Sequence, residues 1–164
     1  MIEGRRSTEE WDEQVNGDKL IKRYQAGERD FSMADLEGAD LREANLWWID
    51  LDRANLRKAD LERANLRGAN LIGADLSGAD LDEANLSRAA LHGANLSGAN
   101  LRGVDLSVAD LGKADLREAN LARANLAGAD LRGADLRGAV VTQGQLAQAN
   151  LLQEAIMPDG TRYK

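Results

Sequence analysis

The sequence predicts an all-β solenoid, in which one short structural unit repeats along a single axis. A five-residue pattern recurs 26 times in succession between Phe31 and Ile156. The pattern reads Ala, then Asp or Asn, then Leu, then two variable residues, and the leucine is unbroken from Leu36 to Leu136. A strict short period of this kind is the signature of a solenoid.

A spacing of five residues fits neither regular element. On an α-helix, five residues advance the side chain by about 500°, so successive leucines would scatter around the axis. On a flat strand, an odd spacing would place alternate leucines on opposite faces. We therefore expect the chain to turn a corner once per repeat, so that four repeats, about twenty residues, close one coil with every leucine inside.

Each position of the repeat has an expected role. The Ala is small enough to share the interior with the leucine, and the Asp or Asn between them points outward. The two variable residues form the corner, and the second is Gly in 10 of the 26 repeats, as a type II turn requires. Where Arg, Lys or Glu stands there, either a different turn forms or the backbone is strained.

Repeats such as Ala34-Asp35-Leu36-Glu37-Gly38 resemble those of the pentapeptide repeat family, and the resemblance covers about four fifths of the chain. The lead-in at 20–31 and the exit at 155–160 are also similar to the family's. The resemblance implies a right-handed quadrilateral parallel β-helix, which we expect to begin with a short N-terminal α-helical cap because the open end of a solenoid must be covered.

The predicted organisation has three parts. Residues 1–28 form an N-terminal segment, of which 1–5 resemble a protease-site scar left by a tag; 29–158 form the β-helix; and 159–164 form a C-terminal tail. Within the first part, Ser7 to Glu10 read as a capping box that opens one helix. Asp18 is expected to open a second, which places Leu20, Ile21 and Tyr24 on one face and ends at Gly27.

The last repeats leave two alternatives open. The stretch from Leu146 to Ile156 reads either as a helix or as continued coils, and coils are favoured because Ala149-Asn150-Leu151 still matches the pattern. Continued coils would place Leu151 and Ile156 inside.

Composition excludes several classes of function. The chain of 164 residues contains no cysteine, no apolar run of the roughly 18 residues that a membrane span needs, and no signal-peptide pattern, so we expect a cytoplasmic protein. His92 is the one histidine and has no catalytic or metal-binding partner at a fixed spacing. We therefore expect no enzyme, cofactor, metal or small-molecule substrate.

The net charge suggests one specific role, and the distribution of the charges disfavours it. The resemblance implies that an acidic member, here with net charge −7, could mimic DNA and bind DNA gyrase. However, the exposed corner positions hold thirteen basic residues against seven acidic ones, and the gyrase-binding relatives tend to have Phe where this chain has Leu. No face collects enough Lys and Arg for direct nucleic-acid binding. The favoured function is a non-enzymatic scaffold or protein-interaction module, and the alternative is a gyrase regulator.

Residues twenty positions apart are expected to stack on one another, so charged residues at this spacing are expected to be neighbours. One column then holds Glu43, Arg63 and Glu83, and another holds Arg42, Glu62, Asp82 and Arg102. Opposite charges placed across neighbouring strands are mildly stabilising. These columns are expected to serve folding.

Trp47 and Trp48 are the candidate protein-binding residues. They occupy both corner positions of one repeat, and Arg67, one coil further on, is placed to stack on Trp47. Exposed aromatic residues beside an arginine are typical of interface hot spots. The alternative is that the tryptophans pack under the N-terminal segment, against Trp11 or Tyr24.

Overall fold

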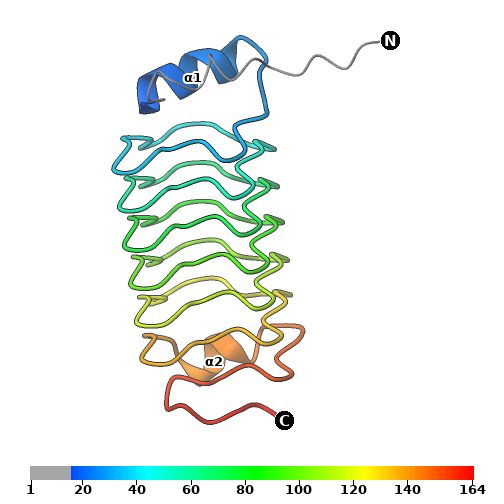
Figure 1. Ribbon diagram of the computed structural model, residues 1–164. Coiled ribbons are helices and arrows are strands. Elements are labelled where there is room, and N and C mark those ends of the chain that lie inside the picture. The colour runs from blue at the N-terminus through cyan, green and yellow to red at the C-terminus, as the bar shows by residue number, and fades with distance from the viewer. Residues whose placement is uncertain (1–15) are drawn as a thin grey trace.

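The computed structural model describes residues 16–164, which form a stack of similar coils (Figure 1). Helix α1 (Gly17–Gln25) lies beyond the first coil and the short helix α2 (Gln143–Leu146) lies at the last one. Parallel bridges join residues twenty positions apart, from the Asp30–Asp50 pair to the Asn120–Val140 pair. Each bridge is a single residue, so the expected all-β solenoid appears as stacked coils without longer strands in the described part.

Four hydrogen-bonded turns shape each coil. In each, the N–H of the Ala position donates to the carbonyl of the leucine three residues earlier, as from Ala39 to Leu36 at 3.0 Å. The second corner residue has a positive φ in every repeat from Met33 to Gly138. Its φ is 66° at Gly38 and 55° at Arg63, so residues other than glycine use the same turn and accept the strain.

Stacked leucine and alanine side chains fill the interior. The leucines from Leu36 to Leu136 are at most 1% exposed, and no polar or charged residue is buried in the described part of the chain. Ile49 and Val104 stand in the Ala position and are fully buried, so the lumen accepts a larger side chain there. Each buried leucine contributes roughly 1.5–3 kcal/mol of transfer free energy.

The outward Asp and Asn side chains brace the corners. The Oδ1 of Asp80 accepts the N–H of Asp82, two residues later, at 3.1 Å, and most repeats make the same bond. At four places within residues 16–164, an Asn one coil after an Asp adds a second bond, as Asn100 Nδ2 donates to Asp80 Oδ1 at 2.8 Å. These local bonds explain why this position favours Asp and Asn.

Helix α1 covers the open first coil. Its N-cap is Asn16, whose side chain accepts the N–H of Lys19 at 2.9 Å, so the helix begins before Asp18, which lies in its first turn. Leu20 and Tyr24 are buried, while Ile21 is only partly so. Gly17 is needed for the close approach, because a Cβ there would lie 2.0 Å from the carbonyl oxygen of Asp40. The capping box predicted at 7–10 lies outside the described residues.

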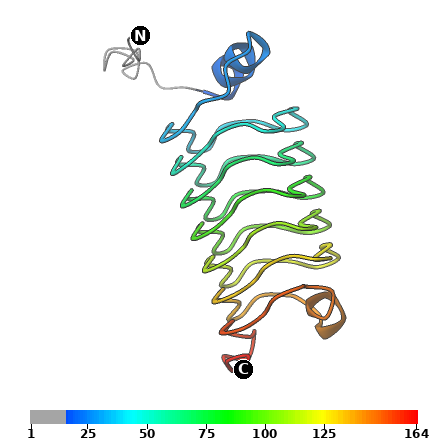
Figure 2. The ribbon, with the colours of Figure 1, turned by 90° about the vertical axis from the view of Figure 1, so that its right-hand side faces the viewer.

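The last coil departs from the predicted register. Its bridges pair Asp130 with Leu151 and Asp135 with Ile156, a separation of 21 instead of 20. The prediction that Leu151 and Ile156 lie inside is therefore wrong: both occupy the outward bridge position, and Leu152 and Met157 pack against the core. Helix α2 replaces one straight side of this coil and takes up the extra residue, and it protrudes from the stack (Figure 2).

Residues 159–164 fold back on the last coil. Ile156 and Arg162 form an antiparallel bridge. The N–H of Tyr163 donates to the carbonyl of Ala155 at 2.8 Å, and the N–H of Glu154 donates to the carbonyl of Tyr163 at 3.0 Å. The segment thus occupies backbone groups that a further coil would have used, which protects an open edge. Across residues 16–164, neither helix has the length and apolar character that a membrane span requires.

Candidate functional site

Trp47 and Trp48 lie at a corner that repeats along the whole stack. We call this corner the tryptophan edge. It consists of Trp47, Trp48, Arg67, Gly68, Ser87, Arg88, Ser107, Val108, Ala127 and Gly128. The N–H of Trp48 donates to the carbonyl of Arg67 at 2.9 Å, and the N–H of Arg88 donates to that of Ser107 at 2.9 Å. Backbone hydrogen bonds therefore join successive coils at this edge.

The two tryptophans are exposed but not loosely attached. Their exposed fractions are 48% for Trp47 and 56% for Trp48. The indole of Trp48 lies against Gly68 of the next coil, since a Cβ on that glycine would come within 2.7 Å of the ring. The hydroxyl of Tyr24 donates to the carbonyl of Trp47 at 2.9 Å. Helix α1 thus holds the backbone of Trp47 and the second coil lies against the ring of Trp48, while much of both rings stays exposed.

The predicted neighbours of the tryptophans are found only in part. Among residues 16–164, the cation–π contacts place Arg23 over Phe31 and Arg29 over Tyr24, so stacking of Arg67 on Trp47 is not among them. The Tyr24 hydroxyl donates to the backbone carbonyl of Trp47. Trp11, the other predicted neighbour, lies outside the described residues.

The sequence interpretation did not group two further side chains with the tryptophans. Arg88 and Val108 lie two and three coils beyond Trp48, and Val108 is 59% exposed. The signal was available in the period of twenty, because both numbers follow from Trp48 by whole coils. The tryptophans drew attention as unusual residues, whereas Arg88 is unremarkable until its column is written out.

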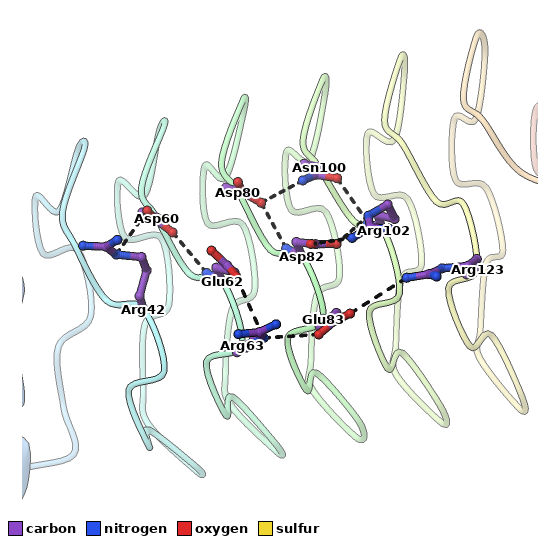
Figure 3. Close-up of polar contacts among 10 residues, drawn as sticks. All are labelled: Arg42, Asp60, Glu62, Arg63, Asp80, Asp82, Glu83, Asn100, Arg102 and Arg123. Atoms are coloured by element: carbon purple, nitrogen blue, oxygen red, sulfur yellow. Dashed lines mark hydrogen bonds and ion pairs between the residues drawn. The ribbon is translucent and has the colours of Figure 1, made fainter.

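The adjacent corner carries a different surface, the charged edge. It consists of Arg42, Glu43, Glu62, Arg63, Asp82, Glu83, Arg102 and Arg123. Arg63 Nε lies 3.2 Å from Glu83 Oε2, and Arg102 Nε lies 3.0 Å from Asp82 Oδ1, each one coil away (Figure 3). These two contacts agree with the predicted columns, but Arg42 pairs with Asp40 and Asp60 and not with Glu62.

The residue before each leucine determines whether an arginine two residues later can form an ion pair with it. Four arginines come two residues after an aspartate and fold back onto it: Arg42, Arg117, Arg132 and Arg137. The Arg42 guanidinium lowers the pKa of the Asp40 carboxyl from 3.8 to about 2, and the same contact lowers the pKa of Asp115, Asp130 and Asp135. Much of the outward negative charge is therefore paired locally.

Other chemistry finds little support. His92 is roughly half exposed, and its Nδ1 lies 3.7 Å from Asp110 Oδ1. Within residues 16–164, no group of three or more His, Asp or Glu side chains is placed to hold a metal ion. A hollow of about 510 Å³ opens beside α2, lined by Leu146, Leu152, Met157 and Tyr163 among others, where the core reaches the C-terminal end of the stack.

Comparison with known proteins agrees with this geometry. Residues 30–68, 69–107, 105–143 and 114–153 match the family model described as pentapeptide repeats, with eight copies. A solved structure of alr5209, a pentapeptide repeat protein from Nostoc PCC 7120, is 46% identical. That match covers 61% of this chain and 80% of that one, with a TM-score of 0.58.

A second solved structure is more distant. QnrB1, a plasmid-mediated fluoroquinolone resistance protein, is 21% identical and also gives a TM-score of 0.58. That match covers 79% of this chain and 75% of QnrB1, and at this identity the likeness concerns the fold alone. A search of curated proteins found no match. Because the family model spans most of the repeat region that the structure shows as stacked coils, this chain belongs to the pentapeptide repeat family.

Proposed function

We propose that this right-handed, four-sided solenoid is a non-enzymatic scaffold of the cytoplasm that binds a protein partner through Trp47, Trp48 and Arg67. The observation that carries the proposal is the pair of half-exposed indoles, with the ring of Trp48 lying against Gly68 and the backbone carbonyl of Trp47 bonded by Tyr24. Aromatic side chains fixed in this way lose little conformational entropy on binding, as at interface hot spots. The lumen, filled by leucine and alanine, leaves no room for a substrate.

The test compares what the protein captures from an extract of its source with and without the indoles. Changing Trp47→Ser and Trp48→Ser together should abolish capture of the specific partner and leave the thermal melt nearly unchanged. The matched control is Met33→Ser with Ile72→Ser, which removes exposed apolar side chains from a different corner. Equal capture by the tryptophan variant and the parent protein would refute the proposal.

The second candidate, a DNA-mimicking regulator of gyrase, rests on the net charge of −7 and the family resemblance. The ion pairs of Asp40, Asp115, Asp130 and Asp135 with their own arginines weigh against it, since a mimic needs unpaired carboxylates at phosphate-like spacing. A gyrase supercoiling assay separates the two: inhibition or quinolone protection at low micromolar protein would favour the regulator, and no effect would favour the scaffold.

A further inference from the structure

The tryptophan edge differs in charge from the rest of the molecule. Its ten residues include no carboxylate, whereas the whole chain has a net charge of −7. Its two charged members, Arg67 and Arg88, have no ion pair within residues 16–164, although most other arginines of the coils have one. A row of two cations therefore stands free on an acidic protein.

The sequence explains why these arginines stay unpaired. Arg67 follows Asn65, so the fold-back contact that Arg42 makes with Asp40 is not available to it. The bridge residues that flank Arg67 and Arg88 are neutral as well: Asn65, Asn70, Asn85 and Ala90. Asp50, Asp105 and Asp110 are the nearest carboxylates in those columns, one coil away. The Oδ1 atoms of Asp50 and Asp105 each accept two local hydrogen bonds, and the Oδ1 of Asp110 accepts the N–H of Gly112 and lies 3.7 Å from His92 Nδ1.

Apolar groups lie on both sides of the two cations. Trp47 and Trp48 precede them along the stack, and Val108 follows them. Coils repeat at about 4.8 Å, so Trp48 and Val108 are separated by roughly 14 Å along the axis. An extended peptide rises about 3.3 Å per residue, so four or five residues would span that distance.

The backbone at the edge carries strain at these same positions. Trp48, Arg88 and Val108 have φ of 58°, 61° and 59°, although ten of the 22 equivalent corners from Met33 to Gly138 use glycine. The other twelve corners carry a side chain with the same positive φ, so the strain at Trp48 and Arg88 does not by itself mark a binding site. At Val108 the β-branch makes the conformation an outlier.

We propose that the tryptophan edge binds an extended acidic segment of a protein partner. Carboxylates of the segment would contact Arg67 and Arg88, and apolar side chains on either side of them would pack against the two indoles and Val108. This inference rests on the proposed function and adds the chemistry of the partner. Charge-assisted bonds from planar guanidinium groups to carboxylates supply orientation as well as affinity.

Nucleic acid fits the edge less well, although phosphate is also an anion. Two free cations are few for a phosphate backbone, whose binding depends on many contacts. The net charge of −7 would also repel a polyanion more strongly than a short peptide with three carboxylates. Single-stranded RNA is therefore an outcome of the test and not part of the proposal.

The test is fluorescence anisotropy of the full chain with a labelled peptide of three glutamates flanked on each side by one leucine. The expected result is saturable binding that weakens as salt is added. Changing Arg67→Gln and Arg88→Gln together should weaken binding by about tenfold or more. The matched control, Arg57→Gln with Lys58→Gln, removes the same charge from another corner and should leave the affinity unchanged.

Several results would overturn the proposal. These are no binding of the peptide at millimolar concentration, equal binding of a peptide with glutamine in place of glutamate, an equal loss in the control variant, or tighter binding of an oligouridylate. The capture experiment then separates the two levels of inference. If the partner is lost with the tryptophan variant but retained with R67Q/R88Q, the acidic preference and the contact through Arg67 fail, while the scaffold that binds through its two tryptophans stands; if both variants retain it, both proposals fail.

Discussion

At the scale of single residues, the corners of the stack carry backbone strain wherever the second corner residue is not glycine. Glycine adopts a positive φ without steric cost, whereas other residues lose about 1–2 kcal/mol there. Twelve of the 22 corners from Met33 to Gly138 nevertheless carry a side chain. The stack tolerates this because the backbone bonds between coils leave the corner no alternative conformation.

Val108 offers the sharpest test of this strain. It is β-branched, has a φ of 59° and is 59% exposed, so it has much to lose from its backbone and little to gain from burial. Changing Val108→Gly should stabilise the protein by about 0.5–1 kcal/mol, after the greater freedom of glycine in the unfolded chain is subtracted. Urea denaturation measures this directly.

The reverse substitution serves as the control. Gly98 has a φ of 64°, and nothing lies within 4 Å of the position its Cβ would take. Changing Gly98→Val should therefore cost about 0.5–1 kcal/mol, which is the backbone strain less the freedom that valine removes from the unfolded chain. If Val108→Gly proves destabilising while Gly98→Val is neutral, the corner strain described here is absent.

The arginines that fold back on aspartates predict how stability depends on acid. Each contact lowers the pKa of its carboxyl in the folded state, to about 2 for Asp40, so below pH 4 the unfolded chain binds more protons. These contributions are complete above about pH 4, the unfolded pKa, and are lost as the pH falls through the folded one. Stability should therefore decrease between about pH 4 and pH 2.

A four-site variant isolates this effect. Changing Arg42, Arg117, Arg132 and Arg137 to Gln should reduce the fall in the urea midpoint between pH 5 and pH 2. The control changes Arg57, Lys58, Arg67 and Arg88 to Gln, which removes the same charge from residues without a carboxylate partner in the described structure. All of the pairs are on the surface, so the difference is expected to be modest. Equal acid sensitivity of the two variants would contradict the assignment.

At the scale of elements, α2 shows how a missing side of a coil is replaced. In a regular coil, a backbone N–H from the following coil donates to the carbonyl of the Ala position, as Asn55 does to Ala34 at 2.9 Å. At Ala124 this donor is the side chain of Gln145, whose Nε2 lies 3.0 Å from the carbonyl oxygen and 2.7 Å from that of Leu121. The amide also closes the capping box with Thr142.

Removing that amide should weaken the C-terminal end. Changing Gln145→Ala leaves the carbonyl of Ala124 without its donor and removes half of the capping box, at a cost of about 1–3 kcal/mol. Gln148→Ala is the matched control, since the structure describes the same amide side chain as exposed there. Hydrogen exchange of the last coil gives a local readout. Unchanged protection in the Gln145→Ala variant would show that water replaces the amide without loss.

The same element marks the limit of what could be predicted from sequence. A strict five-residue period determines the turn, the buried leucine and the outward aspartate, because no regular helix or strand can satisfy it. Ala149-Asn150-Leu151 still fits that period, yet in the structure the register is shifted by one residue, so Leu151 occupies the outward bridge position. The pattern could not show this register shift, because the extra residue is taken up in helix α2, which contains Gln145, and not in the residues whose register changes.

At the scale of the whole molecule, the candidate site was harder to predict than the fold. The tryptophans stood out in the sequence as unusual residues. Whether Arg67 and Arg88 form an ion pair, however, depends on the residues on either side of them and one coil away. Asn65, Asn70, Asn85 and Ala90 are neutral, and replacing one of them by aspartate would give an arginine a partner. Such a property belongs to a column of the stack, which becomes visible only after the chain is wound.

Stability should likewise be a property of the stack, summed over contacts between neighbouring coils. Leu81 lies in the middle, is fully buried and has coils on both sides. Changing Leu81→Ala should cost about 2–5 kcal/mol, because the rigid backbone of adjacent coils cannot collapse into the space left behind. Leu151→Ala removes the same atoms from a residue that the pattern places inside and the structure places at an outward bridge, so its cost should stay below about 1 kcal/mol. Denaturant melts of the two variants test the burial of Leu81 and the register of Leu151. A cost below about half a kcal/mol at Leu81 would place it outside the core. Equal costs at the two positions would mean that Leu151 lies inside, as the five-residue pattern predicts.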